Sequence, residues 1–181
     1  MNFDKDKENF MRVYTPPKNR KNAVCSFLSM LCGSVFFICS YFMPSFRGIA
    51  QLAAFGFWSF AMWIACRYML TGYYYVLEGA NFRIVKVTGK NQQDVGNISM
   101  TTAVFLKKAS EAKDRPPVKN RFDYCSNFMS EQKYVYSFEW NGTSAEIIFE
   151  ASAEFAAIMQ DMMESAKSAA SREPTNGWYD D

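Results

Sequence analysis

The stretch Ala23–Met43, AVCSFLSMLCGSVFFICSYFM, is followed after only Pro44-Ser45-Phe46-Arg47 by the stretch Gly48–Cys66, GIAQLAAFGFWSFAMWIAC. Neither stretch contains an aspartate, glutamate, lysine or arginine. At a rise of about 1.5 Å per residue, each is long enough to cross a hydrocarbon core of about 30 Å as a helix. Because so short a linker cannot carry the chain back across a bilayer, the two helices are expected to form a transmembrane hairpin with both ends on one side.

Two other interpretations of these stretches are a pair of buried helices in a soluble protein and, for the first stretch, a cleaved signal peptide. Membrane insertion is favoured because each strongly apolar residue near a helix centre contributes about −0.3 to −0.6 kcal/mol. A signal peptide is disfavoured because the polar leader is long, the apolar run exceeds about 15 residues, and no small-x-small cleavage site follows before Pro44.

Basic residues determine the expected orientation of this hairpin. Six of them precede the first stretch, Arg67 closes the second, and the connecting loop contains only Arg47. Basic residues concentrate on the cytoplasmic side of membrane helices, so both ends of the hairpin are expected there. The predicted localisation is therefore the cell membrane, with two spans and with the N- and C-termini in the cytoplasm.

Small residues recur at helical spacing along both stretches. Such residues let two helix backbones approach closely inside a bilayer, where no hydrophobic force drives helices together. The pattern predicts packing of the two helices against each other, and association of several copies through the same face is the alternative. The candidate packing residues are Cys25, Ser29, Cys32, Gly33, Ala50, Ala54, Ala61 and Ala65.

The composition argues against several kinds of functional site. The chain has no histidine, which removes Ser-His-Asp and Cys-His catalysis and histidine-ligated zinc. Four of the five cysteines lie in the apolar stretches, and no Cys-x-x-Cys pair or glycine-rich phosphate loop occurs. No catalytic residue, cofactor, metal ligand or small-molecule substrate is therefore predicted. A reactive Cys125 or Asp123 is the enzyme alternative, although neither has an identifiable base or orienting partner.

The distribution of charge after Leu70 bears on the partners to be expected. Acidic residues outnumber basic ones there, so no nucleic-acid partner is predicted. One basic segment is a local exception, and at about 1 kcal/mol per basic residue near an anionic leaflet it would favour docking onto lipid. A solvated loop with ordinary charges is the alternative. The candidate lipid-headgroup contacts are Lys107, Lys108, Lys113, Arg115, Lys119 and Arg121.

Composition divides the chain into four parts. Residues 1–22 are polar and basic and are expected to be a flexible arm, and residues 23–70 contain the helical hairpin. Residues 71–170 alternate short β-like runs with turns and end in an amphipathic helix, and residues 171–181 are expected to be a disordered tail. The strands expected before residue 130 are Tyr73–Glu78, Phe82–Thr88, Val95–Ile98, Thr102–Lys107 and Arg121–Cys125, with loops at Gly89–Asp94 and Ala109–Lys119.

Asn141-Gly142 supports the clearest local prediction, because this pair favours the two-residue type I′ turn of a β-hairpin. With Trp140 opposite Thr143, the strands Lys133–Trp140 and Thr143–Glu150 place aromatic and aliphatic side chains together on one face. A slip of one residue would mix the two faces. The predicted cross-strand partners are Tyr134 with Phe149, Tyr136 with Ile147, Phe138 with Ala145, Val135 with Ile148, Ser137 with Glu146 and Lys133 with Glu150.

After residue 150 the apolar period changes to that of a helix. Ser152 is a suitable N-cap, and Glu154 in the first turn complements the helix dipole. The apolar side chains share one face and are expected to cover the sheet, whereas a promiscuous methionine-rich binding groove is the alternative. The helix is expected to end near Ser171, and its apolar stripe consists of Phe155, Ile158, Met159, Met162 and Ala166.

A succession of short antiparallel strands followed by one amphipathic helix resembles the pleckstrin-homology (PH) fold. The segment Tyr75-Val76-Leu77-Glu78-Gly79-Ala80-Asn81-Phe82-Arg83-Ile84 is similar to the opening hairpin of bacterial membrane-anchored PH-like domains, which often follow a transmembrane pair. The resemblance covers residues 23–168. It implies an α+β membrane protein whose PH-like antiparallel sheet or barrel is closed by the C-terminal helix. It does not extend to phosphoinositide binding, because the turn at residues 79–81 is too short for the basic pocket of the eukaryotic relatives.

These observations favour a non-catalytic, membrane-anchored interaction module that presents a PH-like domain at the cytoplasmic face to a protein partner or to lipid headgroups. The expected partners are membrane lipid and either another membrane protein or a second copy of the chain. A small oligomeric subunit of a membrane transporter or channel is the alternative. An ion pathway is not indicated, because no acidic residue or lysine lies inside the apolar stretches.

Overall fold

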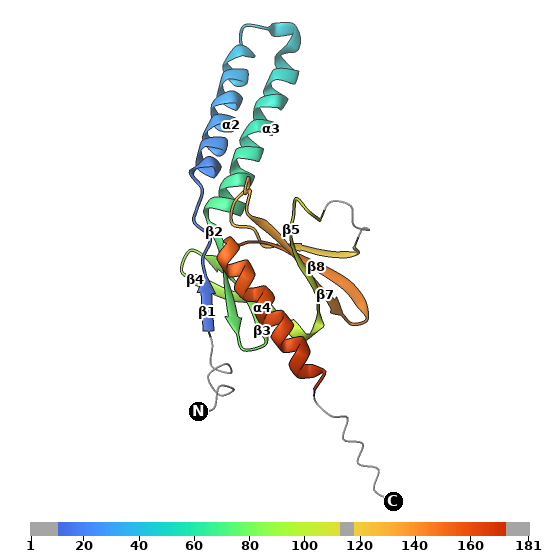
Figure 1. The fold of residues 1–181 in the computed structure, drawn as a ribbon. Helices are drawn as coiled ribbons and strands as arrows, with labels where there is room; N and C mark the ends of the chain where they lie inside the picture. The colour runs from blue at the N-terminus through green and yellow to red at the C-terminus, as the bar shows by residue number, and fades with distance from the viewer. Residues whose placement is uncertain (1–10, 113–117, 173–181) are drawn as a thin grey trace, which may run out of the picture.

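The computed structural model describes residues 11–112 and 118–172. This part of the chain is α+β, as predicted, with two long apolar helices, two four-stranded sheets and a C-terminal helix. Figure 1 shows helices α2 and α3 side by side, projecting together from one end of a body formed by the sheets and α4. The first ten residues of the predicted arm, and residues 173–181 of the predicted tail, lie outside the described residues.

The helical hairpin consists of α2 (Arg20–Cys39), a 3₁₀ turn (Pro44–Phe46) and α3 (Arg47–Ile64), which continues into a π-helical turn (Ala65–Met69). The segments Arg20–Cys39 and Pro44–Met69 are each long and apolar enough to cross a membrane by length and composition. Asn19 caps the start of α2, and its side chain accepts a hydrogen bond from the backbone N–H of Lys21 at 2.9 Å. This cap starts α2 three residues before the apolar stretch itself.

The first sheet contains four antiparallel strands in the order β1-β2-β3-β4. Strands β2 and β3 follow the predicted hairpin closely, and their turn places Gly79 at φ +55°. A short 3₁₀ turn at Met100–Thr102 leads from this sheet to the second one. The strand bounds are β1 Met11–Tyr14, β2 Thr71–Glu78, β3 Asn81–Thr88 and β4 Asn91–Ser99.

Two segments of this sheet correct the sequence-based predictions. Met11–Tyr14 does not belong to a flexible arm, because all four residues pair with β2 and the Tyr14 ring lies 5.1 Å from that of Phe155 in α4. Asn91–Asp94 is not a loop, since only Gly89 and the residue after it separate β3 from β4. The polar composition of this segment misled the prediction, because an exposed sheet strand needs apolar residues only on the face that meets the core.

The second sheet has the strand order β5-β7-β8-β6. The hairpin β7–β8 has the predicted register at every pair, and Asn141 and Gly142 adopt the positive φ angles of a type I′ turn, +50° and +72°. Strand β6 runs parallel to β8, which corrects the prediction of a purely antiparallel arrangement. The strand bounds are β5 Ala103–Lys108, β6 Asn120–Asp123, β7 Lys133–Trp140 and β8 Thr143–Glu150.

The inner faces of the two sheets and helix α4 (Ala153–Ala170) enclose one core. The Ser152 hydroxyl caps α4 as predicted, accepting from the N–H of Phe155 at 3.1 Å. Within the described residues the two sheets are separate ladders, so the barrel alternative is wrong. The α4 face that meets the core contains the predicted Phe155, Met159 and Ala166, with Ile158 and Met162 at its margin and with Ala156 and Met163 in addition.

Two buried tyrosines allow a matched test of this core. The Tyr75 hydroxyl donates to the carbonyl of Tyr124 at 2.9 Å and accepts from the N–H of Glu150 at 3.2 Å. The Tyr136 hydroxyl is also buried, but it has no hydrogen-bond partner among the described residues. A buried hydroxyl is therefore paired at one position and unpaired at the other.

We expect Tyr75→Phe to lower the free energy of unfolding by about 1–3 kcal/mol, because it leaves two buried backbone groups unpaired. Tyr136→Phe removes only an unpaired hydroxyl and is expected to be neutral or stabilising by up to about 1 kcal/mol. Denaturant unfolding of the full-length protein in detergent measures both changes. Equal losses of stability in the two variants would contradict this account of the core.

Candidate functional site

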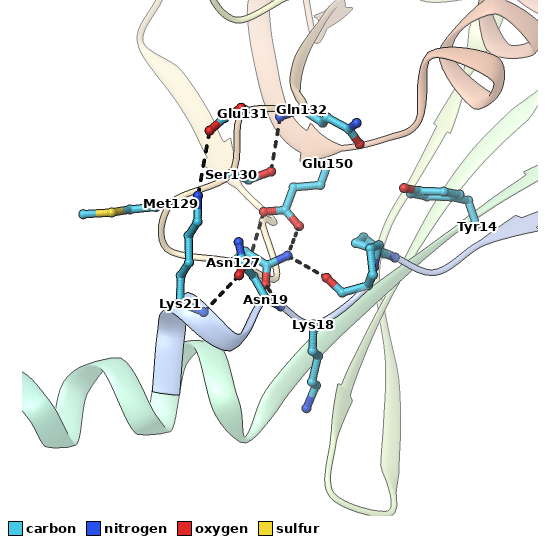
Figure 2. A pocket seen from close by; sticks show the side chains of 12 residues that line it. Tyr14, Lys18, Asn19, Lys21, Asn127, Met129, Ser130, Glu131, Gln132 and Glu150 are labelled. Carbon is cyan, nitrogen blue, oxygen red and sulfur yellow. Dashed lines mark hydrogen bonds and ion pairs between the residues drawn. The ribbon is translucent and has the colours of Figure 1, made fainter. Parts of the chain in front are cut away.

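The hairpin joins the body through a network of buried polar side chains. We call this junction the foot of the hairpin. It is formed where the first turn of α2 and the π-helical turn Ala65–Met69 meet the β6–β7 loop, residues 124–132, and the end of β8. Figure 2 shows some of the polar side chains of the foot, with Asn127 between the start of α2 and Glu150. The foot determines how the helices are held relative to the sheets.

Asn127 connects three segments that are distant in the sequence. Its backbone N–H and its side-chain amide donate to the two carboxylate oxygens of Glu150 at 3.0 and 2.7 Å. The same amide donates to the carbonyl of Pro17 at 3.1 Å. Its side-chain oxygen accepts from the N–H of Asn19 at 2.7 Å and from the amide of Asn22 at 3.1 Å. One asparagine thus joins the β6–β7 loop, strand β8 and the first turn of α2.

Glu150 provides the buried negative charge of this network. It is only 2% exposed, and burial raises the pKa of its carboxyl above the ordinary value. The hydrogen bonds from Asn127 and the positive charge of Lys133, its cross-strand neighbour, oppose that rise without cancelling it. Ionising Glu150 therefore has a cost that the amide donors partly offset.

This burial makes the stability of the protein depend on pH. A carboxyl whose pKa is raised by folding binds its proton more tightly in the folded state than in the unfolded state. The free energy of unfolding should therefore fall as the pH rises from about 4.3, the ordinary glutamate value, through the raised pKa of Glu150. Denaturant unfolding across this range is expected to show a less steep loss of stability in Glu150→Gln than in the wild type, because the variant lacks the contribution of Glu150.

The control for this measurement is Glu139→Gln, at an exposed position of β7. We expect this variant to keep the wild-type slope, because its side chain lies outside the foot. A Glu150→Gln profile as steep as that of the wild type would exclude Glu150 as the source.

A second set of contacts holds the other helix at the foot. The guanidinium of Arg67 lies over the rings of Tyr68 and Tyr73, 5.2 and 5.3 Å from their centroids. It donates to the carbonyl of Asp123 at 2.8 Å and to the Tyr73 hydroxyl at 3.1 Å. The ammonium of Lys18 donates to the carbonyl of Met69 at 2.8 Å. Both helices are therefore tied to the sheets by charged and polar groups, so the hairpin and the body are firmly coupled.

A cavity of about 310 Å³ opens beside this network. It lies between the linker that joins β1 to α2 and the β6–β7 loop, and Tyr14, Asn127 and Glu150 are among its lining residues. An ion pair between Lys21 and Glu131, 3.8 Å apart, lies at its exposed side. The other charged groups that line the cavity have uncharged partners, Lys18 the carbonyl of Met69 and Glu150 the N–H groups of Asn127.

Four of the six predicted basic residues belong to the described part of the chain, and they lie in different surroundings. Lys107 and Lys108 lie exposed at the end of β5, and the N–H of Ala109 donates to the carbonyl of Lys133 at 2.8 Å, which places this end next to the β6–β7 loop. Arg121 instead forms an ion pair at 3.2 Å with the buried Glu146. Lys119 directly precedes β6, whereas Lys113 and Arg115 lie outside the described residues.

Four of the eight predicted packing residues are buried between the two helices: Ser29, Gly33, Ala54 and Ala61. The Ser29 hydroxyl donates to the carbonyl of Phe57 at 2.9 Å, and Ser26, which the prediction omitted, donates to Ala61 at 3.0 Å. Cys25, Cys32, Ala50 and Ala65 are only partly buried.

Cys125 is in a poor environment for nucleophilic chemistry. Its side chain is almost fully buried, and this burial, together with the nearby Asp123 carboxylate, raises the pKa of the thiol far above its ordinary value. Asp123 accepts the N–H of Cys125 at 2.9 Å and so stabilises the local turn. These contacts give both residues a structural role at the end of β6.

Comparisons with protein-family models, with curated proteins and with solved structures find no match to this chain. Sequence reasoning missed Asn22, Asn127 and Glu150 as a group. The one available signal was Asn22, a polar residue immediately before the apolar stretch.

Proposed function

We propose that this protein is a membrane-anchored interaction module. In this proposal α2 and α3 cross the cell membrane as a hairpin, and the foot holds a PH-like body against the cytoplasmic leaflet. The body contacts lipid headgroups at the foot and presents its remaining surface to a protein partner. The N- and C-termini both lie in the cytoplasm.

The observation that carries this proposal is the exposure of the two helices. In the most apolar window of each helix only 17% of the residues are buried, whereas the core helix of a soluble protein would be mostly buried. Large apolar side chains cover the outside of the hairpin, among them Phe27, Phe42 and Leu52. Exposed apolar surface on this scale needs an apolar solvent or an apolar partner. Two helices of spanning length make a bilayer the simplest solvent.

The charges around the foot support the proposed orientation. Lys18, Lys21 and Arg67 lie at the foot. The turn that contains Lys90 is at the same end of the body, because it follows Thr88, and Thr88 pairs with the first residue of β2, directly after the hairpin. The far end of the hairpin has Arg47 as its basic residue. Such an asymmetry supports a cytoplasmic position for the foot.

The PH-like assignment of the body is supported by its element order. A meander of β2, β3 and β4 is followed by the second sheet and then by a C-terminal helix packed on the core of both sheets. The body departs from the expected outline in the additional strand β1 and in the parallel strand β6. The resemblance therefore concerns the central strands and the helix.

The alternative of an oligomeric transporter or channel subunit has less support. Its motivation was the small-residue stripes, but Ser29, Gly33, Ala54 and Ala61 are buried between α2 and α3. These residues are therefore used by the hairpin itself.

Alkaline carbonate extraction and vesicle proteolysis test the proposal. The full-length protein should stay with the membrane pellet at high pH. A protease should digest the body in inside-out vesicles and leave it intact in right-side-out vesicles. Release of the protein by carbonate would overturn the membrane anchor, and digestion in right-side-out vesicles would overturn the orientation.

A further inference from the structure

The β6–β7 loop packs against the hairpin although it belongs to the body. The ring of Phe128 lies edge-on to those of Trp63 and Tyr68, with centroids 6.0 and 5.5 Å away, and 6.2 Å from the ring of Phe60. Phe60 precedes Arg67 by about two helical turns, or about 10 Å along the axis. Phe128 therefore reaches past the basic end of α3 and lies beside its apolar part.

The position of this loop along the hairpin is held by hydrogen bonds. The N–H of Phe128 donates to the side-chain oxygen of Asn22 at 3.0 Å, and Asn22 is buried in the first turn of α2. Asn127, the preceding residue, is joined to Asn19, Asn22 and Glu150. The loop is therefore held at a fixed position along the axis of the hairpin, level with the first turn of α2.

Met129 follows at the exposed end of the loop. It is 60% exposed, and Figure 2 shows its side chain extending outward from the loop, at the edge of the cavity that it helps to line. Next to it lie the exposed Lys21 and Glu131, which form an ion pair. An apolar tip with charged neighbours, beside Trp63 and Tyr68 of the helix, has the composition of a membrane–water boundary.

We propose that the β6–β7 loop is a third membrane contact, in which Phe128 and Met129 enter the boundary between lipid headgroups and acyl chains. The inference rests on the proposed membrane anchoring of α2 and α3. The lipid bilayer is the occupant because the apolar surface of the loop continues directly into that of α3. This contact would set the distance and tilt of the body relative to the leaflet.

Photolabelling of the full-length protein from the lipid phase tests this contact. The protein is placed in vesicles of phosphatidylethanolamine and phosphatidylglycerol with a lipid-soluble aryl diazirine, and a water-soluble thiol scavenges probe outside the bilayer. After irradiation, labelled peptides are mapped by mass spectrometry. The wild-type chain supplies its own controls, because Val104 and Trp140 are exposed apolar residues of the body, both 49% exposed, outside the foot.

We expect label at Phe128 and Met129 about fivefold or more above that at Val104 and Trp140, together with label along α2 and α3. If the helices are labelled but the loop receives no more label than Val104 and Trp140, the third contact is overturned and the proposed anchor stays intact. Absence of label on the helices as well would overturn the anchor itself. Met129→Ser should reduce the label on this loop and leave that on α3 unchanged, and an unchanged loop signal would remove Met129 from the contact.

Discussion

Replacing Gly33 by valine is expected to lower the free energy of unfolding in detergent by about 2–3 kcal/mol, the cost of overpacking a closely packed contact. A Cβ atom at this position would meet Cδ1 and Nε1 of Trp58 at 2.6 and 2.7 Å, and the carbonyl oxygen of Ala54 at 3.0 Å. The backbone of α3 cannot yield as a flexible side chain can. The two helices would therefore have to separate locally, and contacts such as the hydrogen bond from Ser29 to Phe57 would weaken.

Gly56→Val is the matched control for this prediction. Gly56 lies in the middle of α3, and a Cβ there would meet nothing within 4 Å. Both variants introduce the same β-branched residue into a helix, so their difference isolates the contact between the helices. Unfolding followed by tryptophan fluorescence measures both, since Trp58 lies at the contact. If the two variants lose equal stability, close approach at Gly33 does not hold the hairpin together.

Asn127→Leu is expected to cost about 3–5 kcal/mol, because it removes the donor and acceptor that pair with four groups, among them the buried amide of Asn22 and the buried carboxyl of Glu150. Leucine fills a similar volume but leaves the amide of Asn22, the N–H of Asn19 and the carbonyl of Pro17 without this partner. It also withdraws the side-chain donor from the Glu150 carboxylate. We therefore expect the foot to loosen, with faster proteolysis of the linker between β1 and α2.

Asn91→Leu, at an exposed position of β4, is the control for the same chemical change. Denaturant unfolding and limited proteolysis in detergent should show a large effect for Asn127→Leu and a small effect, within about 0.5 kcal/mol, for Asn91→Leu. Similar behaviour of the two variants would mean that the foot does not couple the hairpin to the body.

The elements that sequence analysis predicted are those whose partners lie close by in the chain. The β7–β8 register follows from Asn141-Gly142 and from the alternation on either side of that turn, and the structure has the predicted partners throughout. The cap of α4 depends on residues three positions apart, Ser152 and Phe155. Short-range geometry of this kind is expressed directly in residue spacing.

The elements that sequence analysis missed depend on partners that are distant in the chain. Met11–Tyr14 is a strand because β2, far along the chain, offers it a free edge. Strand β8 lies between β6 and β7 in the sheet, and the β6–β7 loop joins the end of β6 to the start of β7 at one end of that sheet. The chain therefore runs in the same direction in β6 and β8. Neither circumstance has a local sequence signal.

The candidate site also has a part that sequence analysis predicted and a part that it missed. Sequence spacing predicted small residues in the hairpin, and Ser29, Gly33, Ala54 and Ala61 are buried where α2 meets α3. It did not predict that Asn127 would join Asn22 and Glu150, which are separated from it by 105 and 23 positions. A buried amide has no recognisable pattern in the sequence, because its role is defined entirely by the groups that folding brings to it.

Residue spacing alone predicts the two apolar helices, the β7–β8 hairpin and the capped C-terminal helix, since hydrophobic period, turn chemistry and capping act over a few residues. The pairing of β1, the direction of β6 and the polar foot are visible only in the folded chain. Those features arise when the chain closes on itself, because the hydrogen-bonding groups of each segment must find partners among whichever segments are then adjacent.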